Sequence, residues 1–164
     1  MSATHHIAQL NMGQIRQPLD HPVMQGFVEQ LDYINAIADA TTGFVWRLQT
    51  EDGDATAIRP FEADNLLVNM SVWESIDALY DYVYRSDHLK VLRERRQWFE
   101  HMEAAFMVLW WIPAGHIPTL EEAIARLEQL RQHGPGPDAF DFKQPFDSDG
   151  APLRLRGRTK WSAG

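Results

Sequence analysis

Two short segments of this chain carry polar side chains at alternate positions, the spacing that places them on one face of a β-strand. They are Gln9 and Asn11 in the first segment and Asn69, Ser71 and Trp73 in the second. If the two strands are neighbours, these side chains converge on one side of a sheet. A buried amide costs about 1 to 3 kcal/mol unless it is hydrogen-bonded. The group therefore needs partners, either one another in a structural network or a polar-aromatic small molecule held beside apolar walls.

A second group of chemically capable side chains lies within residues 84–99. On the helix that the pattern predicts there, His88 and Arg95 share a face and present an imidazole beside a guanidinium. Since histidine titrates near neutral pH, His88 could remove a proton from a phenol or carbon acid while Arg95 holds the anion. Tyr84 and Trp98 add aromatic surface. The alternative is a solvated helix face whose cations pair with nearby acids.

Motifs for metals, cofactors and other nucleophiles are missing from the sequence. The chain has no cysteine, which excludes disulfides, thiol nucleophiles and thiolate metal sites. It has no histidine or glutamate spacing typical of zinc sites, no glycine-rich nucleotide loop and no Gly-x-Ser-x-Gly elbow. We therefore expect no metal and no cofactor. The alternative is haem, which would need an axial ligand, and His88 is the candidate.

Composition and charge limit the class of protein. A chain of 164 residues with 45% hydrophobic residues is sufficient for one domain with a core. The net charge of -8 argues against nucleic-acid binding, because phosphate neutralisation needs a basic face. Neither a signal-peptide pattern nor a run of 18 apolar residues occurs. We expect a cytoplasmic protein that binds neither nucleic acid nor membrane.

Hydrophobic periodicity and capping residues predict the elements that position these side chains. Strands are predicted over residues 7–12, 43–50, 66–73 and 105–112. Helices are predicted from Pro22 to Ala38, after Ser75, from Ser86 to Phe99 and from Thr119 to His133.

The order of these elements predicts an α+β fold, namely a ferredoxin-like βαββαβ protomer with an extra C-terminal helix. In that topology the first and third strands lie side by side at the sheet centre. The strands are apolar on both faces, and Trp110 and Trp111 must point to opposite faces. We therefore expect the second face to pack on the sheet of a partner chain in a homodimer. The domain is expected to span residues 5–142, followed by an extended basic tail over 143–164 that docks on its own or the partner protomer.

Several segments also resemble an uncharacterised family, a domain of unknown function, within the dimeric α+β barrel superfamily that includes the antibiotic-biosynthesis monooxygenase-like proteins. The resemblance covers roughly residues 5 to 142 and implies two ferredoxin-like protomers whose sheets meet in a barrel. Relatives in that superfamily include cofactor-independent oxygenases of polycyclic phenols, haem-degrading enzymes, cyclases and small-molecule sensors, so the resemblance implies architecture more than reaction. The segments that carry it are QLNMG (9–13) with Arg16 and Pro18, GFVWRLQ (43–49), NMSVW (69–73), YRSDH (84–88), RRQWF (95–99) and LWWIPAGHIPT (109–119).

Together these features predict a small-molecule enzyme of the antibiotic-biosynthesis monooxygenase-like type. Its substrate would be polar-aromatic or anionic and would lie in a pocket between the sheet and the helices, with His88 as acid/base and Arg95 as anion stabiliser. Oxygenation, isomerisation and lyase chemistry all remain open. The alternative is a noncatalytic dimer that binds a small ligand or a protein. The expected substrate-binding residues are Asn11, Asn69, Ser71, Trp73, Tyr84 and Trp98.

Overall fold

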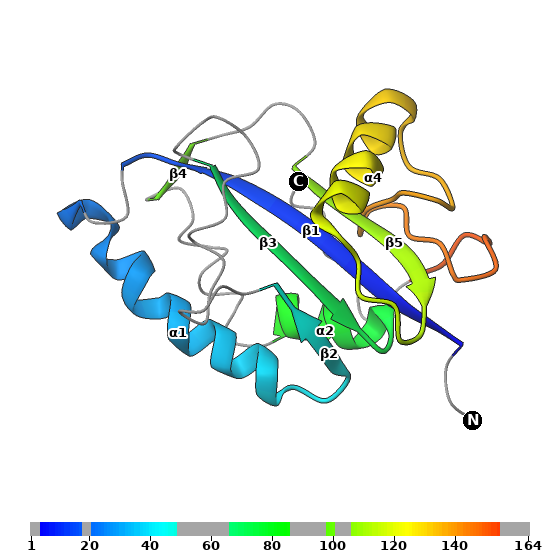
Figure 1. The fold of residues 1–164 in the computed structure, drawn as a ribbon, viewed down its shortest axis with the longest axis horizontal. Coiled ribbons are helices and arrows are strands. Elements are labelled where there is room, and N and C mark those ends of the chain that lie inside the picture. The colour runs from blue at the N-terminus through cyan, green and yellow to red at the C-terminus, as the bar shows by residue number, and fades with distance from the viewer. Residues whose placement is uncertain (1–3, 18–20, 49–65, 86–97, 101–105, 155–164) are drawn as a thin grey trace.

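The computed structural model describes residues 4–17, 21–48, 66–85, 98–100 and 106–154. Its centre is an antiparallel sheet in the order β2-β3-β1-β5, with the short β4 pairing the far end of β1 (Figure 1). The predicted α+β class and the neighbouring first and third strands are therefore confirmed. The strands are β1 (His5–Ile15), β2 (Phe44–Arg47), β3 (Leu66–Trp73), β4 (Phe99–Glu100) and β5 (Met107–Pro113).

Three α-helices are described, and α2 and α4 each begin beside a residue whose side chain caps the first turn. The 3-10 turn at Pro22–Met24 leads into α1 (Gln25–Ala40). The Ser75 Oγ accepts the Ala78 N–H at 3.1 Å before α2 (Ile76–Arg85). The Thr119 Oγ1 accepts the Glu122 N–H at 3.1 Å before α4 (Leu120–His133). Such caps satisfy N–H groups that have no partner inside the helix.

The helix predicted from Ser86 to Phe99 is wrong at its end. Phe99 lies in β4, where it is the register partner of Ile15 in β1. The preceding residue, Trp98, accepts the Arg16 N–H on its backbone carbonyl at 2.8 Å. These contacts with a distant strand use the backbone groups that a helix would need internally. Residues 86–97 lie outside the described residues.

One face of the sheet packs against α4 and forms the α4-side core. Side chains from the even positions of β1, β3 and β5 contribute to it, and Trp110 is fully buried there. The prediction that Trp110 and Trp111 point to opposite faces is confirmed, because Trp111 packs in the cluster on the other face. The α4-side core consists of Ala8, Leu10, Met12, Val68, Met70, Val72, Val108, Trp110, Ile112, Ala123, Leu127, Leu130 and Ala139.

The opposite face carries two separate apolar clusters. The larger, here called the α2-side core, joins β1, β3 and β5 to α2 and to residues after α4. The smaller, here called the α1-side cluster, consists of Met24, Phe27, Leu67 and Trp98. The buried members of the α2-side core are Ile7, Ala38, Trp73, Ile76, Leu79, Tyr80, Leu109, Phe140 and Phe142.

Elements of the same chain therefore pack against both faces of the sheet. The second face of the sheet was expected to pack on a partner's sheet. On the α4 side, however, Leu10, Met70 and Val72 are at most 1% exposed in a single chain. The reason is α4, which supplies Leu127 and Leu130 to their core. The homodimer stays a prediction.

The segment that follows α4 returns to the sheet. Phe140 exchanges two backbone hydrogen bonds with Leu109 of β5, at 2.7 and 3.0 Å. Phe146 and Leu153 then pack against the α2-side core. The division at residue 142 into a domain and a basic tail stays a prediction, and residues 155–164 lie outside the described part of the chain. No described helix is long and apolar enough to cross a membrane.

Candidate functional site

The polar side chains of the two central strands meet as the alternation predicts. In the register of β1 and β3, Gln9 lies opposite Ser71 and Asn11 lies opposite Asn69. Gln9 and Ser71 are only 5% and 7% exposed, and apart from aromatic residues they are the only buried polar side chains in the described residues. We call Gln9, Asn11, Asn69 and Ser71 the amide ladder.

Hydrogen bonds inside the ladder have Gln9 as their hub. The Gln9 Nε2 donates to Asn69 Oδ1 at 2.7 Å and to Ser71 Oγ at 2.8 Å. The Gln9 Oε1 accepts from Asn11 Nδ2 at 3.1 Å. Both N–H groups of the buried amide are therefore used, which offsets the cost of its burial.

The opposite end of the ladder is open. Asn69 is exposed and Asn11 is half-buried. Because Gln9 occupies the Asn69 oxygen, the Asn69 NH₂ group has no partner within the described residues. One Asn11 N–H and the Asn11 Oδ1 are also unpaired there. At its open end the ladder thus presents uncharged hydrogen-bond donors and one acceptor that could bind a ligand.

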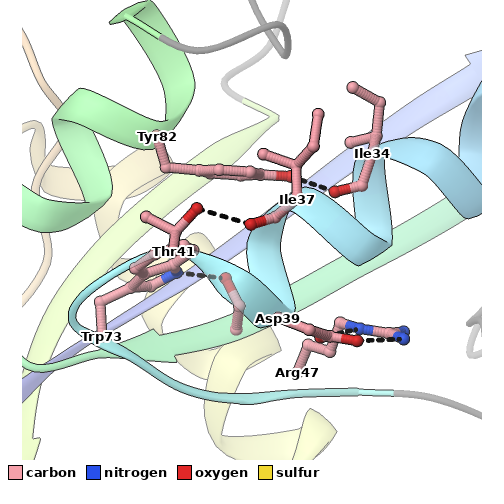
Figure 2. A network of polar contacts seen from close by, with 8 residues as sticks. Ile34, Ile37, Asp39, Thr41, Arg47, Trp73 and Tyr82 are labelled. Atoms are coloured by element: carbon pink, nitrogen blue, oxygen red, sulfur yellow. Dashed lines mark hydrogen bonds and ion pairs between the residues drawn. The ribbon is translucent and has the colours of Figure 1, made fainter.

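Trp73 closes the buried end of the ladder. Its indole Nε1 donates to Ser71 Oγ at 2.9 Å, and its ring stacks on Tyr82 with centroids 4.9 Å apart. Figure 2 shows Tyr82 reaching from α2 toward Ile34 of α1, whose carbonyl accepts the Tyr82 hydroxyl at 3.3 Å. Burial raises the pKa of Tyr82 above its ordinary value of 10.0, while the Arg47 charge opposes that rise. Trp73 is fully buried, so it orients Ser71 from within the core.

The two predicted aromatic residues lie in different clusters. Tyr84 packs in the α2-side core, with its ring 4.7 Å from that of Tyr80. Trp98 packs in the α1-side cluster, with its ring 5.7 Å from that of Phe27. Along β3 the order Leu67, Asn69, Ser71, Trp73 places the ladder between these two clusters.

The predicted catalytic pair, His88 and Arg95, lies outside the described residues. Its part of the chain connects Arg85 at the end of α2 to Trp98. The acid/base and anion-stabilising roles of His88 and Arg95 stay predictions.

Histidine, aspartate and glutamate side chains of the described residues form no group that could hold a metal ion. The His6 Nδ1 is buried without a hydrogen-bond partner, but His6 belongs to no group of metal-ligating side chains among the described residues. The structure therefore assigns no metal-binding role to the described part of the chain.

A separate polar cluster links the last strand to α4. The Glu122 carboxylate accepts the Trp110 indole N–H at 2.9 Å and lies 2.8 Å from His116 Nε2. Burial by itself would raise the pKa of Glu122, but hydrogen bonds from His116 and Trp110, the His116 charge and the Thr119 backbone N–H together lower it. His116 therefore makes a side-chain hydrogen bond from the loop between β5 and α4. Through these bonds Glu122 of α4 links β5 to the loop that connects the two elements.

The role of Gln9 as the hub was not predicted, although its alternation with Asn11 was visible in the sequence. Tyr82 was also missed, because a tyrosine inside a helical pattern carries no sign of what its ring will stack on. Both residues act on the ladder through other side chains, Gln9 by orienting Asn69 and Tyr82 by packing on Trp73.

Solved structures with a similar fold come from several organisms. A conserved protein from Methanosarcina mazei Go1 superposes with a TM-score of 0.48 at 13% identity, over 67% of this chain and 93% of that chain. SnoaB, a cofactor-independent oxygenase from Streptomyces nogalater, gives 0.45 at 18% identity, over 73% and 100%. Rv0793 from Mycobacterium tuberculosis gives 0.45 at 12% identity, over 70% and 99%.

No curated protein matches the sequence. A family model does match, over residues 6–156. This range includes every described strand and helix from His6 onward, and with them the amide ladder. The chain therefore belongs to the family described as a domain of unknown function, DUF3291.

Proposed function

We propose that this protein is a small-molecule enzyme of the antibiotic-biosynthesis monooxygenase-like type, which binds a polar-aromatic or anionic substrate over the amide ladder. One observation carries the proposal. The two buried polar side chains, Gln9 and Ser71, lie at the sheet centre and hold the exposed Asn69 amide in a fixed orientation. Burying an amide in the interior of a sheet costs free energy. Binding a ligand through the oriented Asn69 NH₂ group would explain why the Gln9 amide is buried there.

The chemistry follows from the groups that the ladder leaves unpaired. The Asn69 N–H groups would donate to an oxygen on which negative charge develops, as donors in an oxyanion hole do. Asn11 Oδ1 would accept a hydrogen bond from a substrate hydroxyl and so orient it.

Oxygenation, isomerisation and lyase chemistry can each begin with a phenolate or enolate whose oxygen is bound in this way. In the oxygenation case, a carbon acid loses a proton and its carbanion adds O₂ to form a peroxide anion. That anion takes the proton back to give a hydroperoxide, and loss of water, which removes the remaining hydrogen on that carbon, leaves a carbonyl. We assign the proton removal to His88 and anion stabilisation to Arg95.

Asn69→Ala is the direct test, with polycyclic phenols and their keto tautomers as probes and no added cofactor. O₂ uptake reports oxygenation and calorimetry reports binding. We expect kcat/KM to fall by about 10²-fold, because removing one oxyanion donor costs on that order. Asn69→Ala also leaves one N–H of the buried Gln9 amide without its acceptor, so we expect a loss of about 1 to 3 kcal/mol in the free energy of unfolding. Gln132→Ala removes an exposed amide from α4 and is the matched control. Equal kcat/KM and equal affinity in both variants would refute the proposal.

A noncatalytic ligand-binding protein is the second candidate. It is favoured by the composition of the ladder, whose described members have no side chain that titrates near neutral pH. In that case the same probes would bind to the wild type and more weakly to Asn69→Ala, while no probe would be consumed.

A further inference from the structure

A second site lies beside the outer edge of β5 and shares no lining residue with the amide ladder. It is a pocket of about 290 Å³, close to the lower limit of roughly 300 Å³ for small-molecule sites. β1, β5, α4 and the segment after α4 each contribute to its wall. The residues that give it chemical character are His5, Trp111, Arg126, Asp138, Ser148 and Asp149.

The pocket contains unpaired charges of both signs. Arg126 donates from Nη1 to the backbone carbonyl of Asp138 at 2.8 Å, and it forms no ion pair within the described residues. The carboxylates of Asp138 and Asp149 likewise have no ion-pair partner in the described part of the chain. Opposite charges that line one pocket without neutralising each other are suited to a ligand that carries both signs.

The wall of the pocket is held in place by bonds that do not use these charges. The Asp147 Oδ1 accepts the N–H groups of Asp149 and Ala151, both at 2.9 Å. The Trp111 indole donates to the Phe146 carbonyl at 2.8 Å. The Asp149 turn and the indole ring are therefore oriented before any ligand arrives, which lowers the entropic cost of binding.

The strand edge adds backbone groups to the same wall. Leu109 directs its N–H and C=O away from β1, because both bond to Phe140. Outward and inward groups alternate along an antiparallel strand, so Trp111 directs its own N–H and C=O outward too. Within the described residues these two groups have no backbone partner. They can bond the amine or carboxylate of a ligand.

We propose that this pocket binds a free α-amino acid. The carboxylate pairs with the Arg126 guanidinium, the ammonium lies between Asp138 and Asp149, and the side chain lies against the Trp111 indole. Arginine is suited to the first contact because its planar fork binds a carboxylate with two parallel hydrogen bonds.

The test is calorimetry on the full chain with L-phenylalanine, L-leucine and L-serine, followed by two singly charged analogues of phenylalanine. Phenethylamine lacks the carboxylate and hydrocinnamate lacks the ammonium. We expect at least one amino acid to bind saturably. Its affinity should exceed that of each analogue by roughly 10- to 100-fold, the contribution of a hydrogen bond to an ionised group.

Variants assign the two charges. Arg126→Gln should reduce amino-acid affinity to that of the amine analogue, and Asp149→Asn should reduce it toward that of the acid analogue. Asp149 makes no side-chain hydrogen bond in the described residues, so its variant tests the site even if Arg126→Gln unfolds. Arg131→Gln removes an exposed cation from α4 outside the pocket and should leave affinity unchanged. The proposal is overturned if no amino acid binds up to about 10 mM, or if Arg131→Gln and Arg126→Gln behave alike.

Discussion

Gln9 stabilises the amide ladder through three hydrogen bonds in the middle of the sheet. Gln9→Ala would leave Asn69 Oδ1 and Asn11 Nδ2 without their partner and would open a cavity beside buried Ser71. We expect a loss of about 2 to 4 kcal/mol in the free energy of unfolding, measured by urea denaturation.

Comparing the Gln9→Ala and Asn69→Ala variants distinguishes the structural role of Gln9 from the binding role of Asn69. Gln9→Ala should lower stability by more than Asn69→Ala, because it removes three hydrogen bonds from the sheet centre whereas Asn69→Ala removes one bond of an exposed side chain. Both variants should lower affinity. A Gln9→Ala protein as stable as Gln132→Ala would show that the ladder is not needed for folding.

Glu122 makes the stability of the β5–α4 connection depend on pH. Its pKa is lower in the folded chain than the ordinary value of 4.5, so the folded state holds the proton less tightly than the unfolded state. The stabilisation is therefore present above pH 4.5 and lost as the pH falls through the folded-state value. We expect the difference in Tm between wild type and Glu122→Gln to become smaller as the pH is lowered below 4.5.

His116 provides the control for this pH dependence. It supplies the first of the hydrogen bonds that lower the Glu122 pKa, so His116→Ala should reduce the same acid-dependent part of the stability. A Tm difference between wild type and Glu122→Gln that stays constant from neutral to acid pH would contradict the assignment.

At the scale of elements, the turn between α1 and β2 depends on one glycine. Gly43 has φ of 91°, and a Cβ built there would lie 2.6 Å from the Ala78 Cβ of α2. Its carbonyl also accepts the Glu74 N–H at 2.7 Å. Gly43→Ala therefore combines backbone strain with a clash between helix and turn, and we expect a loss of about 2 to 4 kcal/mol in unfolding experiments.

Gly115 provides a matched comparison. Its φ is 94°, but no atom lies within 4 Å of the position of an added Cβ. Gly115→Ala should therefore lose only the backbone contribution, about 1 to 2 kcal/mol. Equal losses in the two variants would mean that the α2 contact adds nothing at Gly43.

At the scale of the whole molecule, α4 changes where a homodimer interface can lie. Leu127 is 1% exposed within one chain, so Leu127→Ala should cost about 2 to 5 kcal/mol as a core substitution. The same variant should leave the mass in solution unchanged, because the Leu127 side chain is buried within its own chain. Light scattering at micromolar concentration is expected to give a dimer for both proteins, and a monomeric wild type would contradict the prediction.

Sequence patterns were sufficient to predict most of the local structure. Alternation predicted β3 and the shared face of Asn69 and Ser71, and capping residues predicted the starts of α2 and α4. These features depend on a few neighbouring residues, whose backbone geometry repeats every two or 3.6 positions. The amide ladder follows as soon as β1 and β3 are paired.

Tertiary structure alone decided which element covers which surface. Periodicity shows that a strand has an apolar face, but not whether α4 or a second chain will bury it. It also does not show that Phe99 will pair with β1, that Tyr82 will stack on Trp73, or that Arg126 and Asp149 will line one pocket. Each of these contacts joins residues far apart in the chain, and their free energy depends on the packing of the complete fold.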